Sequence, residues 1–410
     1  MIRTLPVTRK TEHSRTESRV HYPALDGLRA VAFLLVFFYH YCWLPWGWCG
    51  VSFFFVLSGF LITGILLDTR DAPYRVRNFY VRRTLRIFPL YWGVFAFALL
   101  STPFIHWNWS SAFLGRPLYI GNYLRYVSAL AARPGAPLYP AASGQLFSAR
   151  FHGAELFFGH FWSLCVEEQF YLIWPWVVFF VRRSRVLVLS TILVVVLPIL
   201  RAVLHSTLPT WMIQGDILYR ATPFQLDALI LGAILAILWR TAPRQTLLRV
   251  GQLALPFLAA AAIIFTAVGM IHASPHPLWG YVYPAWEYTW GLSFFNLLGA
   301  ALILDTLRQH SLVSRCFSVR PAQWLGRISY GAYVFHFLSA GCFISLGKHL
   351  AMHRGIPAEQ AELLGQHWAW VFALPATIVI AWLSFRYFES PFLSLKERLT
   401  VRPAQVEQYA

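Results

Sequence analysis

Residues 21–62, HYPALDGLRAVAFLLVFFYHYCWLPWGWCGVSFFFVLSGFLI, decide how this chain folds. They hold two apolar runs, each long enough to cross a bilayer as a helix, separated by a short turn rich in Pro, Trp and Gly. Arg29 and His40 lie in the first run, and eleven positions of helix place them on one face, about 16 Å apart along the axis. Because ionisable side chains are costly in hydrocarbon, such residues usually face the bundle interior and mark a working site. The alternative is a histidine bonded to nearby backbone and an arginine that snorkels to the surface.

The composition of the whole chain extends this conclusion. Of the 410 residues, 58% are hydrophobic and 12% are charged, and a soluble domain carries about twice that charged fraction. The expected fold class is therefore an all-α polytopic membrane protein, since the pattern lacks the short alternating strands of a membrane barrel. Ten spans are predicted from runs of about twenty apolar residues: 28–46, 50–68, 88–107, 160–181, 186–204, 223–239, 250–271, 286–305, 325–347 and 367–386.

The net charge of +17 is best explained as a topology signal. Most of the basic residues fall into the connections that alternate with the predicted spans, and the positive-inside rule then places both termini in the cytoplasm. No nucleic-acid partner is therefore expected. Residues 1–20 are predicted to be a basic cytoplasmic tail, 21–392 a single transmembrane domain, and 393–410 a second tail. Within the domain, 108–159 are predicted to form a long extracytoplasmic loop, of a size that is often functional.

The five cysteines are scattered, and their spacing fits neither a metal site nor a disulfide framework. No metal is expected. A pairing of Cys42 with Cys49 on an oxidised face is the one alternative to free thiols.

Residues 161–175, FWSLCVEEQFYLIWP, place two adjacent carboxylates in an otherwise apolar helix. Ser163, Glu167 and Tyr171 share one face at a spacing of four, whereas Glu168 points about 100° away. Glu167 is predicted at a depth similar to that of His40, and a carboxylate that orients an imidazole is the usual partner of a general base. The alternative is that the helix dipole favours acids near the start of the helix.

Residues 80–92, YVRRTLRIFPLYW, bring Arg82, Arg83 and Arg86 together just before a helix expected to start near Pro89. Arginine forks suit phosphate oxygens, although positive-inside charge or contact with anionic lipid headgroups explains the cluster equally well.

Residues 324–336, WLGRISYGAYVFH, are too polar for a helix that faces lipid, so their polar side chains are expected to line the interior. Arg327 is either a further phosphate ligand or a packing residue. The other polar residues of this stretch are Ser329, Tyr330, Tyr333 and His336.

Taken in order, these motifs resemble the acyltransferase 3 family of integral-membrane O-acyltransferases, over residues 22–392. The motifs that carry the resemblance are LDGLR at 25–29 with ten residues between Arg29 and His40, Gly50-Val51, FFVLSGF at 54–60, the Arg83/Arg86 pair, WSL at 162–164 with EEQFY at 167–171, RISYG at 327–331 and YFESP at 387–391. Ser52 departs from the pattern, because related proteins commonly carry an acid there. The hydrolase-like C-terminal domain of many members is also missing, so a separate periplasmic partner or a homo-oligomer is conceivable.

The resemblance implies an acyl-CoA donor, usually acetyl-CoA, used from the cytoplasmic side of the cytoplasmic (inner) membrane. His40 is then the general base, oriented by Glu167 or Glu168. Arg83 and Arg86 hold the coenzyme's phosphates, with Arg82 and Arg327 as further ligands. Arg29 either binds the coenzyme or steadies the site.

The implied acceptor is a hydroxyl of a cell-surface or lipid-linked carbohydrate. The long outer loop, with His152 and His160, is expected to form its entrance, and membrane lipids surround the domain. The residues expected to line the substrate path are Ser58, Ser163, Tyr171, Tyr330 and His336.

Two other classes of function fit ionisable residues inside a membrane. A transporter or flippase of a glycan also uses buried His, Glu and Arg, but such proteins often show repeated halves, and no internal repeat is visible here. A non-catalytic scaffold would tolerate the combined loss of His40, Glu167 and Arg83.

Overall fold

The structure is a computed structural model. It describes residues 22–42, 44–104, 106–107, 117–123, 149–151, 154–155, 158–208, 217–272, 274–276, 280–282 and 287–401. Most of these residues are helical, which confirms the expected all-α membrane fold. Five short strands lie in the connections: β1 (His106–Trp107), β2 (Ala149–Phe151) and β3 (Ala154–Glu155) form one antiparallel sheet, and β4 (Ser274–His276) pairs with β5 (Gly280–Val282).

Seven helices in the described part of the chain are long and apolar enough to cross a membrane. They are α1 (Pro23–Cys42), α2 (Cys49–Asp68), α3 (Arg75–Ser101), α7 (Arg183–Thr207), α11 (Arg244–His272), α12 (Leu292–Leu307) with the π-helical turn η4 (Glu287–Gly291) before it, and the helical stretch Trp368–Leu399, which begins inside α16 (Ala358–Leu383). Two further predicted spans are helices as well. They are not among the seven for different reasons. In α6 (Trp162–Phe180), two glutamates and a glutamine lower the mean hydropathy, and α10 (Leu226–Thr241) is only 16 residues long. Which side of the membrane each terminus occupies stays a prediction.

The predicted span 325–347 is wrong as a single helix. It consists of α14 (Arg320–Leu338) and α15 (Ala340–His353), which meet at an angle of 55°. Ser339 joins them with φ −96° and ψ 6°, outside the α-helical region. With this bent pair counted as one span, the number of candidate spans rises to eight. Broken helices expose backbone groups at membrane depth, which is tolerated where protein surrounds them.

The predicted start of the third span is also wrong. The helix α3 begins at Arg75 rather than near Pro89, so the cluster of arginines lies within it. Pro89 is accommodated inside the helix, as membrane helices often allow.

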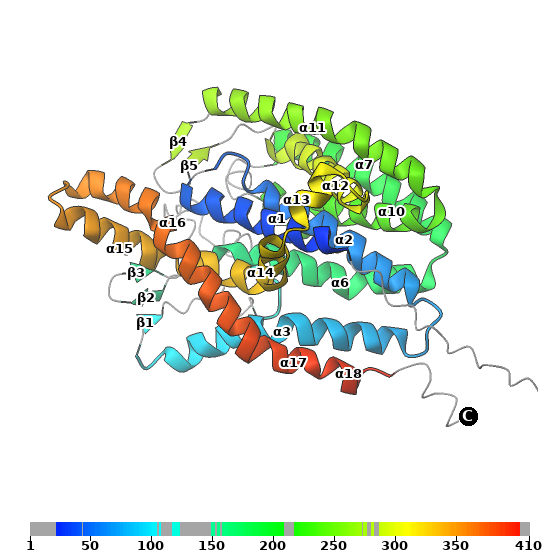
Figure 1. The fold of residues 1–410 in the computed structure, drawn as a ribbon, viewed down its shortest axis with the longest axis horizontal. Helices are drawn as coiled ribbons and strands as arrows, with labels where there is room; N and C mark the ends of the chain where they lie inside the picture. The colour runs from blue at the N-terminus through cyan, green and yellow to red at the C-terminus, as the bar shows by residue number, and fades with distance from the viewer. Residues whose placement is uncertain are drawn as a thin grey trace, which may run out of the picture.

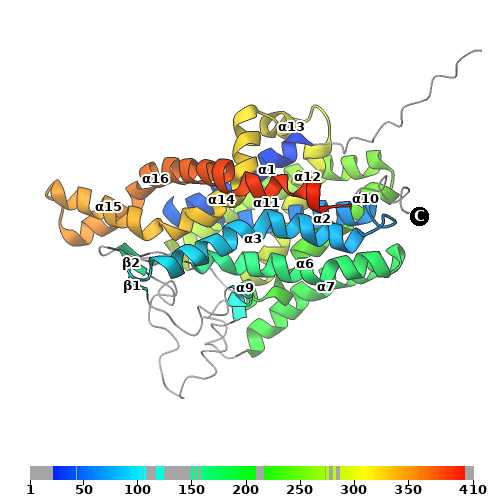
Figure 2. The ribbon, with the colours of Figure 1, turned by 90° about the horizontal axis from the view of Figure 1, so that it is seen from below.

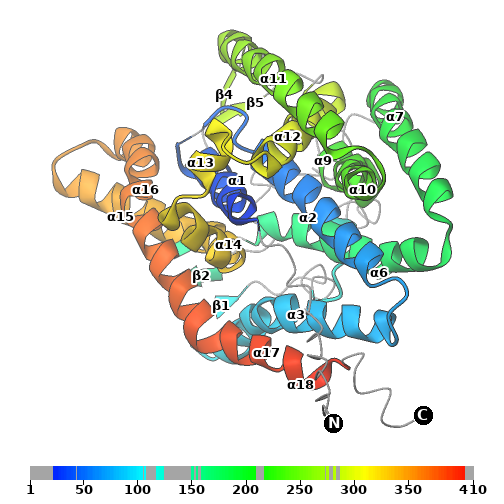
Figure 3. The ribbon, with the colours of Figure 1, turned by 45° about the vertical axis from the view of Figure 1, so that its right-hand side comes forward.

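The helices α1 and α2 occupy the centre of the bundle, with α6, α10, α12 and α14 around them (Figure 1 and Figure 3). The hairpin of α15 and α16 projects at the end that also holds β1–β3 (Figure 2). The start of α3 lies at the opposite end, beside α18 (Lys396–Leu399). The remaining short elements are α9 (Ile217–Arg220), α13 (Leu312–Phe317), α17 (Ser390–Ser394), η2 (Gly159–Phe161), η3 (Thr222–Phe224) and η5 (Ser384–Glu389).

Two glycines let α2 and α10 approach each other closely. A Cβ atom at Gly59 would lie 1.9 Å from the carbonyl oxygen of Leu229, and one at Gly232 would lie 2.0 Å from that of Val56. Small residues at such crossings allow backbone contact, which stabilises helix pairs in membranes through van der Waals packing. All five cysteines are free thiols in the structure, so the alternative Cys42–Cys49 disulfide is not formed.

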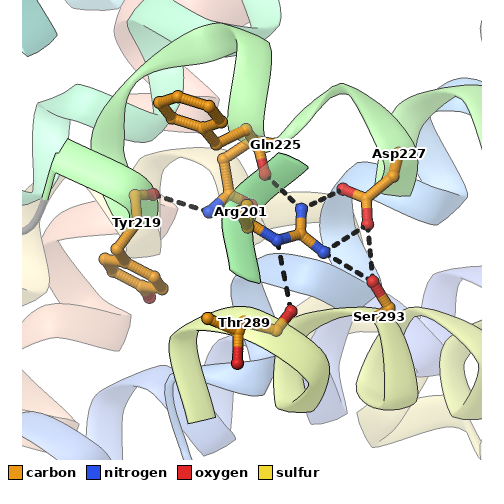
Figure 4. Close-up of polar contacts among 7 residues, drawn as sticks. Arg201, Tyr219, Gln225, Asp227, Thr289 and Ser293 are labelled. Carbon is orange, nitrogen blue, oxygen red and sulfur yellow. Dashed lines mark hydrogen bonds and ion pairs between the residues drawn. The ribbon is translucent and has the colours of Figure 1, made fainter. Parts of the chain in front are cut away.

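A buried ion pair ties α7 to α10 and α12 (Figure 4). The guanidinium of Arg201, which is completely buried, donates to both carboxylate oxygens of Asp227, at 3.0 and 2.8 Å. Its remaining donors reach the carbonyl oxygens of Phe224 at 2.6 Å and Thr289 at 3.2 Å, and the hydroxyl of Ser293 at 2.5 Å. Every nitrogen of this guanidinium therefore has an acceptor, as a charge buried in hydrocarbon requires.

Replacing one partner of this pair should destabilise the protein more than replacing both. Arg201→Met leaves the Asp227 carboxylate buried without a cation and should lower the free energy of unfolding by about 3–5 kcal/mol. The double variant Arg201→Met/Asp227→Leu should recover most of that loss. Thermal unfolding of the purified full chain in detergent measures this, with Arg185→Met, an exposed position on the same helix, as the control. Equal instability of the single and double variants would contradict the role of the pair.

Candidate active site

A polar cavity of about 120 Å³ lies at the centre of the bundle, between α1, α2, α3, α6 and α14. Its walls bring together eight residues that the sequence predicted as site residues from five separate motifs: Arg29, Ser58, Arg83, Arg86, Ser163, Glu167, Tyr171 and Tyr330. Ser329 and Tyr333, expected in the interior, line it as well. These residues from separate motifs therefore share one cavity, and their roles in a reaction stay a prediction.

Glu167 is the hydrogen-bond acceptor at the centre of this cavity. Its Oε1 atom accepts a short hydrogen bond from the hydroxyl of Ser58 on α2 and a second one from the hydroxyl of Tyr171, at 3.2 Å. The guanidinium of Arg83 lies over the ring of Tyr171, 4.1 Å from its centroid. Two hydroxyl donors and a nearby cation thus fix the Glu167 side chain in place.

The two residues after Glu167 point elsewhere. Gln169 donates to the carbonyl oxygen of Tyr119 at 2.6 Å and to the side chain of Asn122 at 3.1 Å, and accepts from Thr222 at 2.5 Å. Gln169 therefore anchors a described part of the predicted outer loop. Glu168 does not line the cavity, and its Oε1 atom is buried with no hydrogen-bond partner among the described residues.

The expected contact between His40 and Glu167 is not made. Within the described part of the chain, no hydrogen bond or ion pair joins the two side chains. The His40 ring instead packs on Phe337, with ring centroids 4.1 Å apart, and lies 5.4 Å from the ring of His336. The break after Leu338 brings the end of α14 against the end of α1, where the hydroxyl of Tyr41 donates to the carbonyl oxygen of His336 at 2.7 Å. The similar depth predicted for His40 and Glu167 therefore does not make the two side chains neighbours.

His336 is completely buried beside His40. Its Nδ1 atom lies 2.6 Å from the carbonyl oxygen of Tyr333, so this nitrogen carries the proton of a neutral ring. The Nε2 atom then has a free lone pair, and it has no hydrogen-bond partner among the described residues. His336 was expected to line the substrate path, but it does not line the central cavity. It lies behind Tyr333, which does.

His160 belongs to the same group of rings, 5.0 Å from His336 between centroids. It was expected at the mouth of an outer loop, but it is buried, and its Nε2 atom lies 3.0 Å from the carbonyl oxygen of Val334. His152 falls outside the described residues.

Tyr333 lies at the boundary between the central cavity and these histidines. Its side chain lines the cavity, and its ring centroid is 5.3 Å from that of His336 and 5.4 Å from that of His160. Its hydroxyl group is 2.5 Å from the hydroxyl of Ser163 and 3.2 Å from the carbonyl oxygen of His160. The Tyr333 ring thus lies between the central cavity and the rings of His160 and His336, and His40 contacts this group through His336.

A second cavity, of about 420 Å³, adjoins the first one on the side of the arginine cluster. Arg29, Arg83 and Arg86 line both cavities. The larger one is also lined by Arg82, Arg327 and Lys396 and by one acid, Asp26, which accepts from Arg29 at 2.7 Å. We call this space the cationic cavity. All four arginines predicted as phosphate ligands meet there, and planar guanidinium groups are suited to bidentate contacts with phosphate oxygens.

Lys396 and Asp26 were missed by the sequence analysis. Lys396 was assigned to a cytoplasmic tail, because a lysine after the last apolar span is what the positive-inside rule predicts. Asp26 precedes Arg29 by three positions, a spacing that brings helical side chains together and could have indicated the pair. Among the described residues, no cluster of three metal-ligating side chains occurs.

Comparison with known proteins places this site in a family. Residues 22–386 match a family described as an acyltransferase domain. The peptidoglycan O-acetyltransferase OatA of Listeria monocytogenes is 28% identical over 91% of this chain, and the putative peptidoglycan O-acetyltransferase YrhL of Bacillus subtilis is 28% identical over 93%. The O-acetyltransferase OatA of Staphylococcus aureus is 24% identical over 90%.

The chain spans 56%, 56% and 57% of the lengths of these three relatives. No solved structure matches it. Because the family match covers nearly the whole described bundle, the predicted resemblance is confirmed, and the chain belongs to the acyltransferase 3 family of membrane proteins.

Proposed function

We propose that this protein is a membrane-bound O-acyltransferase that transfers an acyl group from cytoplasmic acyl-CoA to a carbohydrate hydroxyl of the cell envelope. The names of its relatives, which are O-acetyltransferases, favour acetyl as the acyl group. The observation that carries this proposal is a cationic cavity that shares three arginines with a polar cavity deep in the bundle. Relatives named as O-acetyltransferases of peptidoglycan support the reaction class and the acceptor.

The residues of the cationic cavity fit the phosphate groups of a coenzyme. Six cationic side chains face a single carboxylate among its described lining residues, and that carboxylate is already paired with Arg29. Arg83 and Arg86, which belong to both cavities, hold the phosphates closest to the bundle centre. The thin arm that carries the acyl group extends past them, between Ser58 and Tyr330, towards Ser163. The donor supplies an activated carbonyl group as a thioester.

His40 is the general base in this proposal. It lies in the last turn of α1, a helix that contacts β5, and part of its surface is accessible. An acceptor hydroxyl enters from this end of the helix. His40 takes the hydroxyl proton as the oxygen attacks the thioester carbonyl, the carbon–sulfur bond breaks, and the proton passes to the departing thiolate. Glu167 positions the donor side of the site, rather than the imidazole.

His336 is a positioning residue for His40. Its Nδ1 atom is held by a hydrogen bond to the backbone of α14, which fixes the ring. The ring lies beside those of His40 and His160.

Removing the His40 imidazole should abolish transfer without affecting the donor. His40→Ala should lower the acylation of envelope glycans at least about a hundredfold, because a general base contributes that much or more. Mass spectrometry of glycans from cells measures transfer, and calorimetry with coenzyme A measures donor binding, which should be unchanged. His349→Ala, an exposed position on α15, is the control. Unchanged acylation at a normal protein level would remove His40 from the mechanism.

Removing an arginine shared by both cavities should weaken donor binding. Arg86→Gln should raise the dissociation constant for coenzyme A about tenfold, through loss of a charged hydrogen bond to phosphate. Arg77→Gln, exposed on the same helix and outside both cavities, should bind as the parent chain does. Equal affinities of the two variants would contradict the assignment of the phosphate site.

Changing His336 should affect turnover more than donor affinity. His336→Phe preserves a ring but removes both nitrogens, and should lower kcat about tenfold with little change in the KM for the donor. His336→Asn retains an amide donor for the carbonyl of Tyr333 and should recover part of the loss. If both variants changed KM and kcat alike, a purely structural role for His336 would be indicated.

A further inference from the structure

The C-terminal segment closes the cationic cavity with a lysine that lies outside the region matched by the family. Lys396 lines the cavity together with arginines of α3 and α14, although the family match ends at residue 386. Its helix, α18, packs against α3, so a residue far along the chain completes the wall (Figure 2 and Figure 3).

Hydrogen bonds hold this segment in place. The side-chain amide of Asn78 on α3 donates to the carbonyl oxygen of Val401 at 3.0 Å and accepts from its backbone N–H at 3.1 Å. The hydroxyl of Thr400, which is buried, donates to the carbonyl oxygen of Lys396 at 2.7 Å. The pair of bonds to Asn78 ties the C-terminal end of this segment to α3, the helix that carries Arg82, Arg83 and Arg86, and the Thr400 bond holds Lys396 to that end.

Lys396 belongs to the outer part of the cavity. Arg29, Arg83 and Arg86 line both cavities and therefore lie nearest to Glu167. Arg82 and Lys396 line only the cationic cavity, and therefore lie farther from the central cavity. A donor whose thioester reaches the central cavity must keep its most distant phosphate in this outer part.

We propose that Lys396 binds the ribose phosphate of the donor, the phosphate farthest from the thioester, while Arg83 and Arg86 bind the diphosphate. This inference rests on the proposed use of acyl-CoA. An ammonium group is a compact point charge with three donors, which suits the terminal oxygens of a phosphate monoester. The phosphate of an anionic lipid headgroup has the same chemistry, so the test must separate the two sources.

The test compares coenzyme A with 3′-dephospho-coenzyme A as ligands of the full chain in phosphatidylcholine nanodiscs. Lys396→Gln should weaken the binding of coenzyme A about fivefold, as expected for a partly exposed charged contact, and leave the binding of the dephospho form unchanged. Lys396→Arg should restore the affinity for coenzyme A. Arg398→Gln, exposed on the same helix and outside the cavity, should leave both affinities as they are.

Each other result overturns the proposal. An equal loss of affinity for both ligands would assign Lys396 to the diphosphate or to the general field of the cavity, and no loss with either would remove it from the site. If phosphatidylglycerol in the nanodisc abolished the difference between Lys396→Gln and the parent chain, the residue would be a lipid ligand. Failure of the parent chain to bind coenzyme A at all would instead refute the proposed function.

Discussion

A charged group cannot be left alone in hydrocarbon, and this constraint organises the bundle. Arg201 satisfies it with Asp227 and with carbonyl oxygens of neighbouring helices, so that its charge serves to hold α7 in place. Arg83 and Arg86 satisfy it differently, by lining a space that is polar enough to receive a ligand, and Arg29, which is paired with Asp26, lines the same space. The same physical cost therefore produces a fully paired structural contact in one place and a cavity with free binding capacity in another.

The run of Glu167, Glu168 and Gln169 shows how one helix serves several neighbours at once. Successive residues of a helix point about 100° apart, so three adjacent polar side chains meet three different surroundings. Glu167 is held in the central cavity by Ser58 and Tyr171, whereas Gln169 fastens a loop segment around Asn122. Only the first of the three is in direct contact with the space that we assign to the donor.

The helix α14 ends beside His40, where it breaks before α15. His40, His160 and His336 form one group of rings there, and Tyr333 lies between the rings of His160 and His336 and the central cavity. In the proposed reaction, the donor and its phosphates occupy the two cavities, and the base and the acceptor meet at this group of rings.

The sequence by itself determined the membrane fold, the inward-facing motifs, the family and the arginines that gather at one end. The lengths of apolar runs can be read along the chain, and the cost of a buried charge predicts that polar motifs inside such runs face the bundle interior. It placed His40 and Glu167 at similar depth, but it could not show that they have different neighbours. Their lateral positions depend on contacts between distant segments, such as those of Glu167 with Ser58 and of His40 with Phe337. Tertiary structure alone also decided the bend at Ser339 and the position of Lys396, since both result from packing rather than from hydropathy.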